Sequence, residues 1–337
     1  MDDQEKQKQG LREPIMRNRE GEPQYHEKYI FNTVNGIPTI PGSSIKGVIR
    51  SVAEAVSNSC LTFFEKDKNT NYRTYSSQKF NWDNGRHITV RTPFSLADNF
   101  YPCTDINNLC ITCRLFGFQS PEKSFQGKVN ISDAQTRDGY KYLDWITLTE
   151  LSSPKPHHKA FYTLPSDLNK IAGRKFYFHH KPNAPILTSA EKTHRNSTMK
   201  PIADGAVFDL KVTFTNLADN EYILLLYSFF LQDGVCHKIG YGKPAGLGSV
   251  KIEPIKLALF DIEKRYRGFI TSDKGGREDE ELKRYIEDQT ELYRKDSSKN
   301  LEELRRIWKW PGIYDIQYPD FRNWFLKNPN APISKTP

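Results

Sequence analysis

The hydrophobic pattern of this chain is clearest after the segment that runs from Ile40 to Gly47. Pro41 and Gly42 predict a turn, and Ser43 or Ser44 is typical of a residue that caps a helix. The apolar residues that then recur at helical spacing are Ile45, Val48, Ile49, Val52 and Val56. The pattern therefore predicts a turn that leads directly into an amphipathic helix ending near residue 55.

The opposite face of this predicted helix carries Lys46, Arg50 and Glu54. The two cations lie above the first turn, where unpaired N–H groups and the helix dipole already favour an anion. A phosphate group fits such a place. A well-capped surface helix with solvated lysines also explains this stretch when it is taken alone.

The rest of the pattern predicts both strands and helices. Apolar alternation predicts strands over 127–134, 145–151, 207–214 and 249–257, and an almost continuous apolar run predicts a buried helix over 221–232. After about residue 260 the pattern is that of charged helices that end before Pro311, and we expect their apolar stripe to pack on the main body or on a neighbouring subunit. These elements indicate an α+β protein.

The domain organisation follows from where these patterns stop. Residues 1–25 are polar and show no alternation, so we expect a mobile N-terminal arm. The main domain is expected over 26–260, with loop-rich insertions at about 61–125 and 152–204. Residues 261–337 are expected to form a helical C-terminal extension.

Charge and composition favour some classes of protein but do not identify one. The 337 residues include 49 Lys and Arg against 41 Asp and Glu, a net charge of +8 that suits a polyanion such as nucleic acid. There is no apolar run long enough for a membrane span and no basic-then-apolar leader, so we expect a cytoplasmic protein without a membrane partner.

Three of the five cysteines are crowded together in a C-x6-C-x2-C arrangement formed by Cys103, Cys110 and Cys113. Two thiolates spaced as C-x2-C can reach one tetrahedral ion, and a fourth ligand must come from elsewhere. The candidates are His87, which we favour because it lies in the same insertion, and Cys60, which is equally typical of a buried thiol. The hypothesis is a structural zinc ion, against the alternative of free reduced cysteines.

The glycine-rich turn from Gly240 to Gly248 is not a nucleotide-binding loop. Such loops follow a strand and open a helix, whereas here a predicted helix precedes the glycines and a strand follows them. Two explanations remain open: tight packing of a helix on a sheet, or close approach of the backbone to a polyanion.

The insertion over 152–204 is basic and contains interleaved aromatic residues. It holds five histidines, at positions 157, 158, 179, 180 and 194, together with Tyr162, Tyr177 and Phe178. Cations for phosphates and rings for bases are what a single-stranded nucleic-acid groove needs. A solvated loop with aromatic anchors is the alternative. No catalytic triad can be argued from the spacing.

Five motifs in one order resemble the RAMP superfamily of CRISPR-associated proteins, particularly the backbone subunits of type III effector complexes, and the match includes a possible III-D-like member. These motifs are residues 40–47, Cys110 with the following residues to Gly117, 127–134, 173–177 and 240–248, and together they span about 26–258.

The resemblance implies a ferredoxin-like, RRM-related core in which the first helix and the glycine turn flank a path for guide RNA. The positions that it assigns to RNA binding are Ser43, Ser44, Lys46, Arg50, Arg174, Lys175, Tyr177, Gly242, Lys243, Gly246 and Gly248. The implied partners are a CRISPR guide RNA, a target RNA and other effector subunits, acting in antiviral defence. A phosphate track of this kind is independent of sequence.

Two departures from the family pattern concern the N-terminal region. The family begins with a core strand ahead of the Ile-Pro-Gly motif, and residues 1–24 supply no convincing one. Relatives that cleave their target carry an aspartate at a place corresponding to about His26, so His26 is only a weak catalytic candidate.

Three functions follow from these observations. The preferred one is an RNA-holding subunit of a type III ribonucleoprotein. The alternatives are a metal-assisted endoribonuclease that cuts target or precursor RNA, and a zinc-stabilised structural adaptor whose basic loops contact protein.

Overall fold

The structure, a computed structural model, describes residues 6–7, 9–61, 79–82, 86–89, 100–119, 123–150, 160, 163–260, 276–316, 324, 327–328 and 331, with the backbone alone for 79–82, 86–89 and 168–169. The helices are α2 (Gly42–Val56), α3 (Ile111–Phe116), α5 (Asp219–Phe229), α7 (Asp279–Gln289), α8 (Glu291–Lys295) and α9 (Lys299–Ile307), with a 3-10 turn η2 (Lys243–Ala245).

The strands are short and numerous. They are β1 (Arg12–Arg17), β2 (Pro23–Ile30), β3 (Thr33–Val34), β4 (Ile37–Ile40), β5 (Lys79–Trp82), β6 (Arg86–Thr89), β7 (Phe118–Gln119), β8 (Ser124–Phe125), β9 (Val129–Ile131), β10 (Ala134–Thr136), β11 (Ile146–Thr147), β12 (Thr163–Leu164), β13 (Asp167–Ile171), β14 (Ser197–Lys200), β15 (Phe208–Asp209), β16 (Val212–Phe214), β17 (His237–Lys238), β18 (Ser249–Val250), β19 (Lys256–Leu257) and β20 (Arg277–Glu278). The mixture of helices and small sheets confirms the predicted α+β class.

Two sheets have four strands each, in the orders β1-β2-β14-β11 and β15-β10-β4-β3, and the other strands form two-stranded sheets. Strands β14 and β2 are parallel, and the other pairs in these sheets are antiparallel. Strands β9 and β16 continue the pairing of β10 and β15 across Ser132, whose N–H donates to the carbonyl of Lys211. The predicted strand over 249–257 is reduced to the separate two-residue strands β18 and β19.

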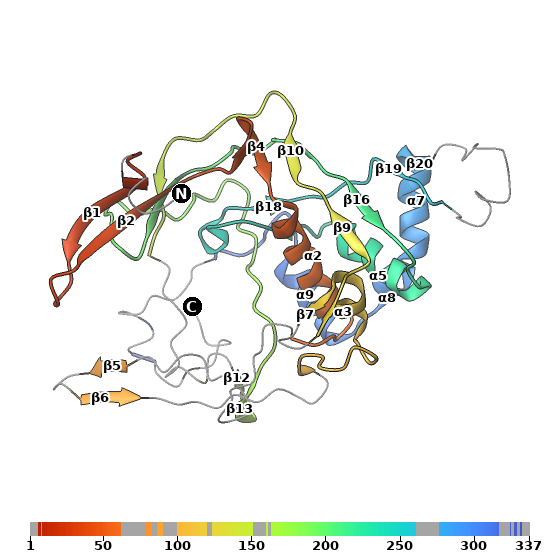
Figure 1. Ribbon diagram of the computed structural model, residues 1–337, viewed down its shortest axis with the longest axis horizontal. Helices are drawn as coiled ribbons and strands as arrows, with labels where there is room; N and C mark the ends of the chain where they lie inside the picture. Colours follow the sequence, from red (N-terminus) through yellow and green to blue (C-terminus); the bar gives the residue numbers. More distant parts are fainter. Residues whose placement is uncertain are drawn as a thin grey trace.

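The N-terminal region corrects one expectation. Within residues 1–25, expected to form a mobile arm, the structure places β1 and the start of β2 as an antiparallel hairpin (Figure 1). The hairpin is half-exposed and is joined by ion pairs, including Arg12 with Glu27. A strand without a buried apolar face shows no alternation of apolar and polar residues. For this reason the hydrophobic pattern does not predict the hairpin.

The hydrophobic core forms where α2 contacts α3, α5 and α9 (Figure 1). Helix α2 buries Ile45, Ile49 and Val52 there, which confirms the predicted apolar stripe. Its partners in the core include Leu224 and Leu225 of α5 and Leu301 and Leu304 of α9. The C-terminal helix α9 therefore packs on the main body of the same chain. Across the described part of the chain, no helix has both the length and the apolar character that crossing a membrane requires.

Candidate metal centre and nucleic-acid interface

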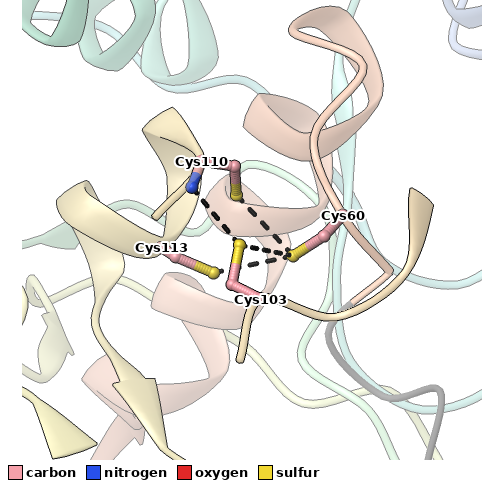
Figure 2. Close-up of side chains that lie close together, drawn as sticks. All are labelled: Cys60, Cys103, Cys110 and Cys113. Carbon is pink, nitrogen blue, oxygen red and sulfur yellow. Dashed lines mark hydrogen bonds between the residues drawn. The ribbon is translucent and has the colours of Figure 1, made fainter. Parts of the chain in front are cut away.

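The cysteine cluster gathers four thiols from separate segments (Figure 2). Cys60 follows α2, Cys103 lies in the connection ahead of α3, Cys110 is the N-cap of α3, and Cys113 lies within that helix. All four sulfur atoms lie within 4.8 Å of one another. The backbone N–H of Cys110 donates to the sulfur of Cys103 over 3.3 Å, which holds one prospective ligand in place.

The spacing of these sulfurs fits a tetrahedral ion. Four sulfurs at the usual Zn–S distance of about 2.3 Å are about 3.8 Å apart. The sulfur of Cys60 lies 3.6 Å from those of Cys113 and Cys110 and 3.9 Å from that of Cys103. The four cysteines are therefore a donor set that can hold a metal ion with little rearrangement.

The protonation of the thiols is strongly coupled. Hydrogen bonds with Cys113 and Cys60 lower the pKa of Cys110. The hydrogen bond with Cys110 raises the pKa of Cys60 to about 12 and also raises the pKa of Cys113. A metal ion that binds here must displace the remaining protons, because thiolates are the ligands.

The fourth thiol belongs to Cys60, the less favoured of the two candidates. In the sequence Cys60 is equally typical of a plain buried thiol, whereas the structure places it within reach of all three other sulfurs. The side chain of His87, the favoured candidate, lies outside the described residues. Cys60 is far from the other three cysteines in the sequence, but α2, the helix that precedes it, contacts α3. Distance along the sequence was therefore a misleading guide to the fourth ligand.

A buried ion-pair network supports this cluster. Glu54, whose side chain is only 8% exposed, accepts from Arg50 over 2.9 Å and from Arg174 over 3.0 Å. Arg50 also donates to the carbonyl of Gly117 and to the sulfur of Cys113, and Arg174 donates to the carbonyls of Ser59 and Cys60.

These contacts change the interpretation of three residues. Glu54 was expected on the solvent face of α2, but it is buried between the two arginines. Arg50 and Arg174 were predicted to contact RNA phosphates, whereas their guanidinium groups are engaged inside the protein. Two arginines beside four thiols also offset the negative charge that metal-bound thiolates carry. Both arginines thus have a structural role at the cysteine cluster.

The N-terminus of α2 is capped from another part of the chain. Pro41 is the N-cap residue. The expectation that Ser43 or Ser44 caps the helix is therefore wrong. Instead, Oδ1 of Asp133 accepts from the backbone N–H of Gly42 over 2.7 Å. A carboxylate therefore already lies at this helix end, which weakens it as a phosphate site. Ser43 and Ser44 are exposed in the first turn.

Lys46 retains more freedom than Arg50. Its ammonium group donates to the carbonyl of Val129 over 3.2 Å and is half-buried. Burial and the nearby Arg50 lower its pKa. No carboxylate among the described residues pairs with Lys46, so this cation is the candidate on α2 that can still take a phosphate.

Backbone conformation and close packing explain why glycine occupies three positions of the turn that the resemblance assigns to RNA binding. Gly242, Gly246 and Gly248 have φ angles of +70°, +108° and +82°, which favour glycine. An added Cβ would lie 1.9 Å from the carbonyl oxygen of Ile239 at Gly248, and 3.2 Å from the His180 ring at Gly246. Strand β18 follows the turn as predicted, but the short strand β17 lies between helix α5 and the glycines, so a strand and not the predicted helix directly precedes the turn.

The remaining predicted RNA contacts are accessible. Lys175 is exposed, and its ammonium lies 4.8 Å from the centre of the Tyr177 ring. Lys243 is half-buried and donates to the carbonyl of Gly240 over 2.7 Å. Neither lysine pairs with a carboxylate among the described residues, so both can face a polyanion.

His26 is not an accessible acid–base group. The residue is fully buried, with one ring nitrogen 2.9 Å from the carbonyl oxygen of Thr193 and the other 2.8 Å from the hydroxyl of Thr198. Both nitrogens are thus used to join β2 to β14 and to the segment that leads into it. The candidate catalytic role of His26 is corrected to a structural one.

Sequence reasoning also missed Lys238, which lies in β17 just before the glycine turn. It is the one lysine or arginine that is buried among the described residues, with 2% of its surface exposed. Burial and Lys243 lower its pKa to about 8. The only signal in the sequence is its place next to the glycines.

No curated protein matches the chain. The model of the RAMP superfamily matches residues 15–251, which covers α2, the cysteine cluster and the glycine turn. The match includes the five motifs whose order resembles that family. The chain belongs to the RAMP superfamily of CRISPR-associated proteins.

Proposed function

We propose that this chain is a subunit of a type III, III-D-like CRISPR ribonucleoprotein, which binds the backbone of the guide RNA and helps to position a target RNA in antiviral defence. The observation that carries the proposal is the family match over 15–251, because RAMP proteins are CRISPR-associated and bind RNA in complexes. A ferredoxin-like core over about 26–260 and assembly with other effector subunits belong to the same proposal.

The accessible cations support an RNA path that is independent of sequence. Lys46, Lys175 and Lys243 come from three different segments, and none has a carboxylate partner among the described residues. Phosphate contacts by lysines give affinity without reading bases. Tyr177 beside Lys175 adds a ring on which a base can stack. These three lysines therefore suit a subunit that holds RNA.

We also propose that the metal held by the four cysteines is zinc, in a structural role. Four thiolates in a tetrahedral arrangement leave no open position for a water molecule or a substrate. The ion would fix the segment that follows α2 against α3. It would thus stabilise the protein and take no part in cleavage.

The experiment is purification of the chain together with the subunits that associate with it, followed by extraction of nucleic acid. We expect RNA of a uniform short length. A complex that contains no nucleic acid, while still assembling with partner proteins, contradicts RNA binding and favours the structural adaptor.

A further inference from the structure

The four sulfur atoms of the cysteine cluster are close enough to react with one another as well as to hold a metal. The sulfur of Cys60 lies 3.6 Å from that of Cys110 and 3.6 Å from that of Cys113, and all four thiols are free. The two sulfurs of a disulfide are about 2.05 Å apart. A movement of about 1.5 Å therefore closes the gap between Cys60 and either neighbour.

The four cysteines differ in their exposure to solvent. Cys103 and Cys110 are partly exposed, whereas Cys60 and Cys113 are buried. A small reactant that comes from the solvent therefore meets Cys103 or Cys110 first. Of these two, Cys110 is the closer to Cys60, with 3.6 Å between the sulfurs against 3.9 Å for Cys103. An accessible cysteine thus lies beside a buried one whose sulfur can complete a disulfide (Figure 2).

Cations beside the cluster favour the reactive form of its cysteines. Arg50 donates to the sulfur of Cys113 over 3.6 Å, and Arg174 donates to the carbonyl of Cys60 over 3.2 Å. The carboxylate of Glu54 pairs with both arginines and balances one of the two positive charges. A nearby positive charge favours the thiolate, which is the form of cysteine that attacks an oxidant. Reactive cysteines are typical of such partly exposed, electropositive surroundings.

We propose that the cysteine cluster is also an oxidation site, at which a peroxide converts Cys110 and Cys60 into a disulfide and the metal ion leaves. The inference rests on the proposed structural zinc. The Cys110 thiolate attacks one oxygen of the peroxide, which breaks the O–O bond, forms a sulfenic acid and releases hydroxide. The Cys60 thiolate then attacks the Cys110 sulfur, which forms the S–S bond and releases a second hydroxide. Two protons from the solvent convert the hydroxides to water, and the two electrons lost by the sulfurs reduce the peroxide.

Oxidation leaves only Cys103 and Cys113 to hold the ion, and two thiolates do not complete the four-ligand set of a structural zinc site. The disulfide keeps the segment that follows α2 linked to the start of α3. The connection that carries Cys103 is no longer tied to them through the metal. Because a thiol reductant reverses the disulfide, the cluster works as a reversible redox switch for this connection.

The first test treats the full-length, zinc-loaded protein with hydrogen peroxide. A chelating dye measures the released zinc, and peptide mapping without reduction identifies the disulfide. We expect one zinc ion to be released for each Cys60–Cys110 disulfide that forms, together with faster amide hydrogen exchange over residues 103–109. Dithiothreitol followed by zinc should restore the original exchange.

Variants identify the role of each sulfur. In Cys60→Ser the sulfenic acid of Cys110 has lost its partner, so we expect it to accumulate and to be labelled by dimedone. Cys236→Ser is the matched control, because Cys236 is buried outside the cluster, and it should behave like the wild type. If Cys60→Ser does not fold, dimedone added to the wild type during oxidation gives the same assignment, because it competes with Cys60 for the sulfenic acid.

Two results overturn the inference. One is a wild type that keeps its zinc and forms no disulfide at a peroxide dose that fully oxidises glutathione in a parallel sample. The other is a disulfide that leaves out Cys60 or Cys110. A purified protein without zinc refutes the proposed metal, and the mapped disulfide then still decides the pairing. Absence of RNA from the reduced complex is a separate outcome, because it refutes the proposed RNA binding and leaves the oxidation site unaffected.

Discussion

Asp133 accepts a hydrogen bond from the backbone N–H of Gly42, with 2.7 Å between Oδ1 and the nitrogen. The two residues are 91 positions apart in the chain and belong to two of the motifs that identify the family. An added Cβ at Gly42 would lie 2.3 Å from the carbonyl oxygen of Ile131, so only glycine allows this approach. One motif thus supplies the cap for the helix that the other begins.

Replacing this cap should destabilise the fold. We expect Asp133→Ala to lower the free energy of unfolding by about 1 kcal/mol, because the N–H of Gly42 loses its acceptor. Asp133→Asn retains an acceptor oxygen and should lose less. Urea denaturation of the three proteins measures the difference. Equal stability of Asp133→Ala and wild type would show that water replaces the carboxylate.

Lys46 should contribute to RNA affinity without supporting the fold. Lys46→Glu is expected to weaken RNA binding and to reduce the salt slope by about 0.7 for one lost phosphate contact. The melting temperature should change little, since one hydrogen bond to Val129 is lost. Lys299→Glu provides the same charge change at an exposed site.

Arg50→Glu is the informative comparison for Lys46→Glu. It places a second carboxylate beside buried Glu54 and removes the donor to Cys113. The expected result is a clear loss of stability, which thermal melting detects. A stable Arg50→Glu protein with reduced RNA affinity would indicate instead that Arg50 contacts an RNA phosphate.

The cysteine cluster should bind one zinc ion per chain. We expect Cys113→Ser to lose the metal and to melt at a lower temperature, and a chelator to lower the melting temperature of the wild type. Cys236→Ser is the matched control, because Cys236 is also buried but lies outside the cluster. Elemental analysis of the purified proteins gives the stoichiometry.

The pH dependence of zinc binding follows from the thiols. Because the pKa of Cys60 is raised to about 12 and that of Cys113 is also raised, zinc displaces protons on binding. The apparent affinity should therefore increase with pH. Equal zinc content in the wild type and in Cys113→Ser would contradict the assigned ligands.

Glu221 should account for part of the acid sensitivity of the fold. Burial alone would raise its pKa, but hydrogen bonds from Lys128 and Arg114, each 2.7 Å long, lower it below 4.5. A carboxylate with a lowered pKa stabilises the protein above pH 4.5, and this stabilisation is lost as the pH falls through the lowered value.

The variant Glu221→Gln tests this assignment. It leaves Lys128 and Arg114 without their shared carboxylate, and we expect a loss of about 3 kcal/mol at pH 7, at the low end for a broken buried pair. Stability should then depend less on pH between 3 and 5. Glu13→Gln, which breaks more exposed pairs with Lys28 and Lys192, should cost less than about 1 kcal/mol. Identical acid denaturation of Glu221→Gln and wild type would contradict the assignment.

The sequence by itself determined the elements whose signal is local. The apolar spacing from Ile45 to Val56 requires a helix with one buried face, and α2 has it. The glycines at 242, 246 and 248 predicted a turn, and their positive φ angles show why other residues are disfavoured. The C-x2-C spacing of Cys110 and Cys113 indicated a metal site because both ligands lie on one short helix.

Only the tertiary structure decided which polar residues are available to a partner. In the sequence, Arg50 and Arg174 are cations close to Lys46 and Lys175, and nothing distinguishes the four as phosphate ligands. In the structure, both arginines form ion pairs with the buried carboxylate of Glu54. Cys60 joins the cysteine cluster, and Lys238 is buried without a counter-ion, through contacts between segments that are far apart in the chain. Burial and charge pairing depend on contacts between residues that are distant in the sequence. The periodicity of apolar residues along the chain does not reveal these contacts.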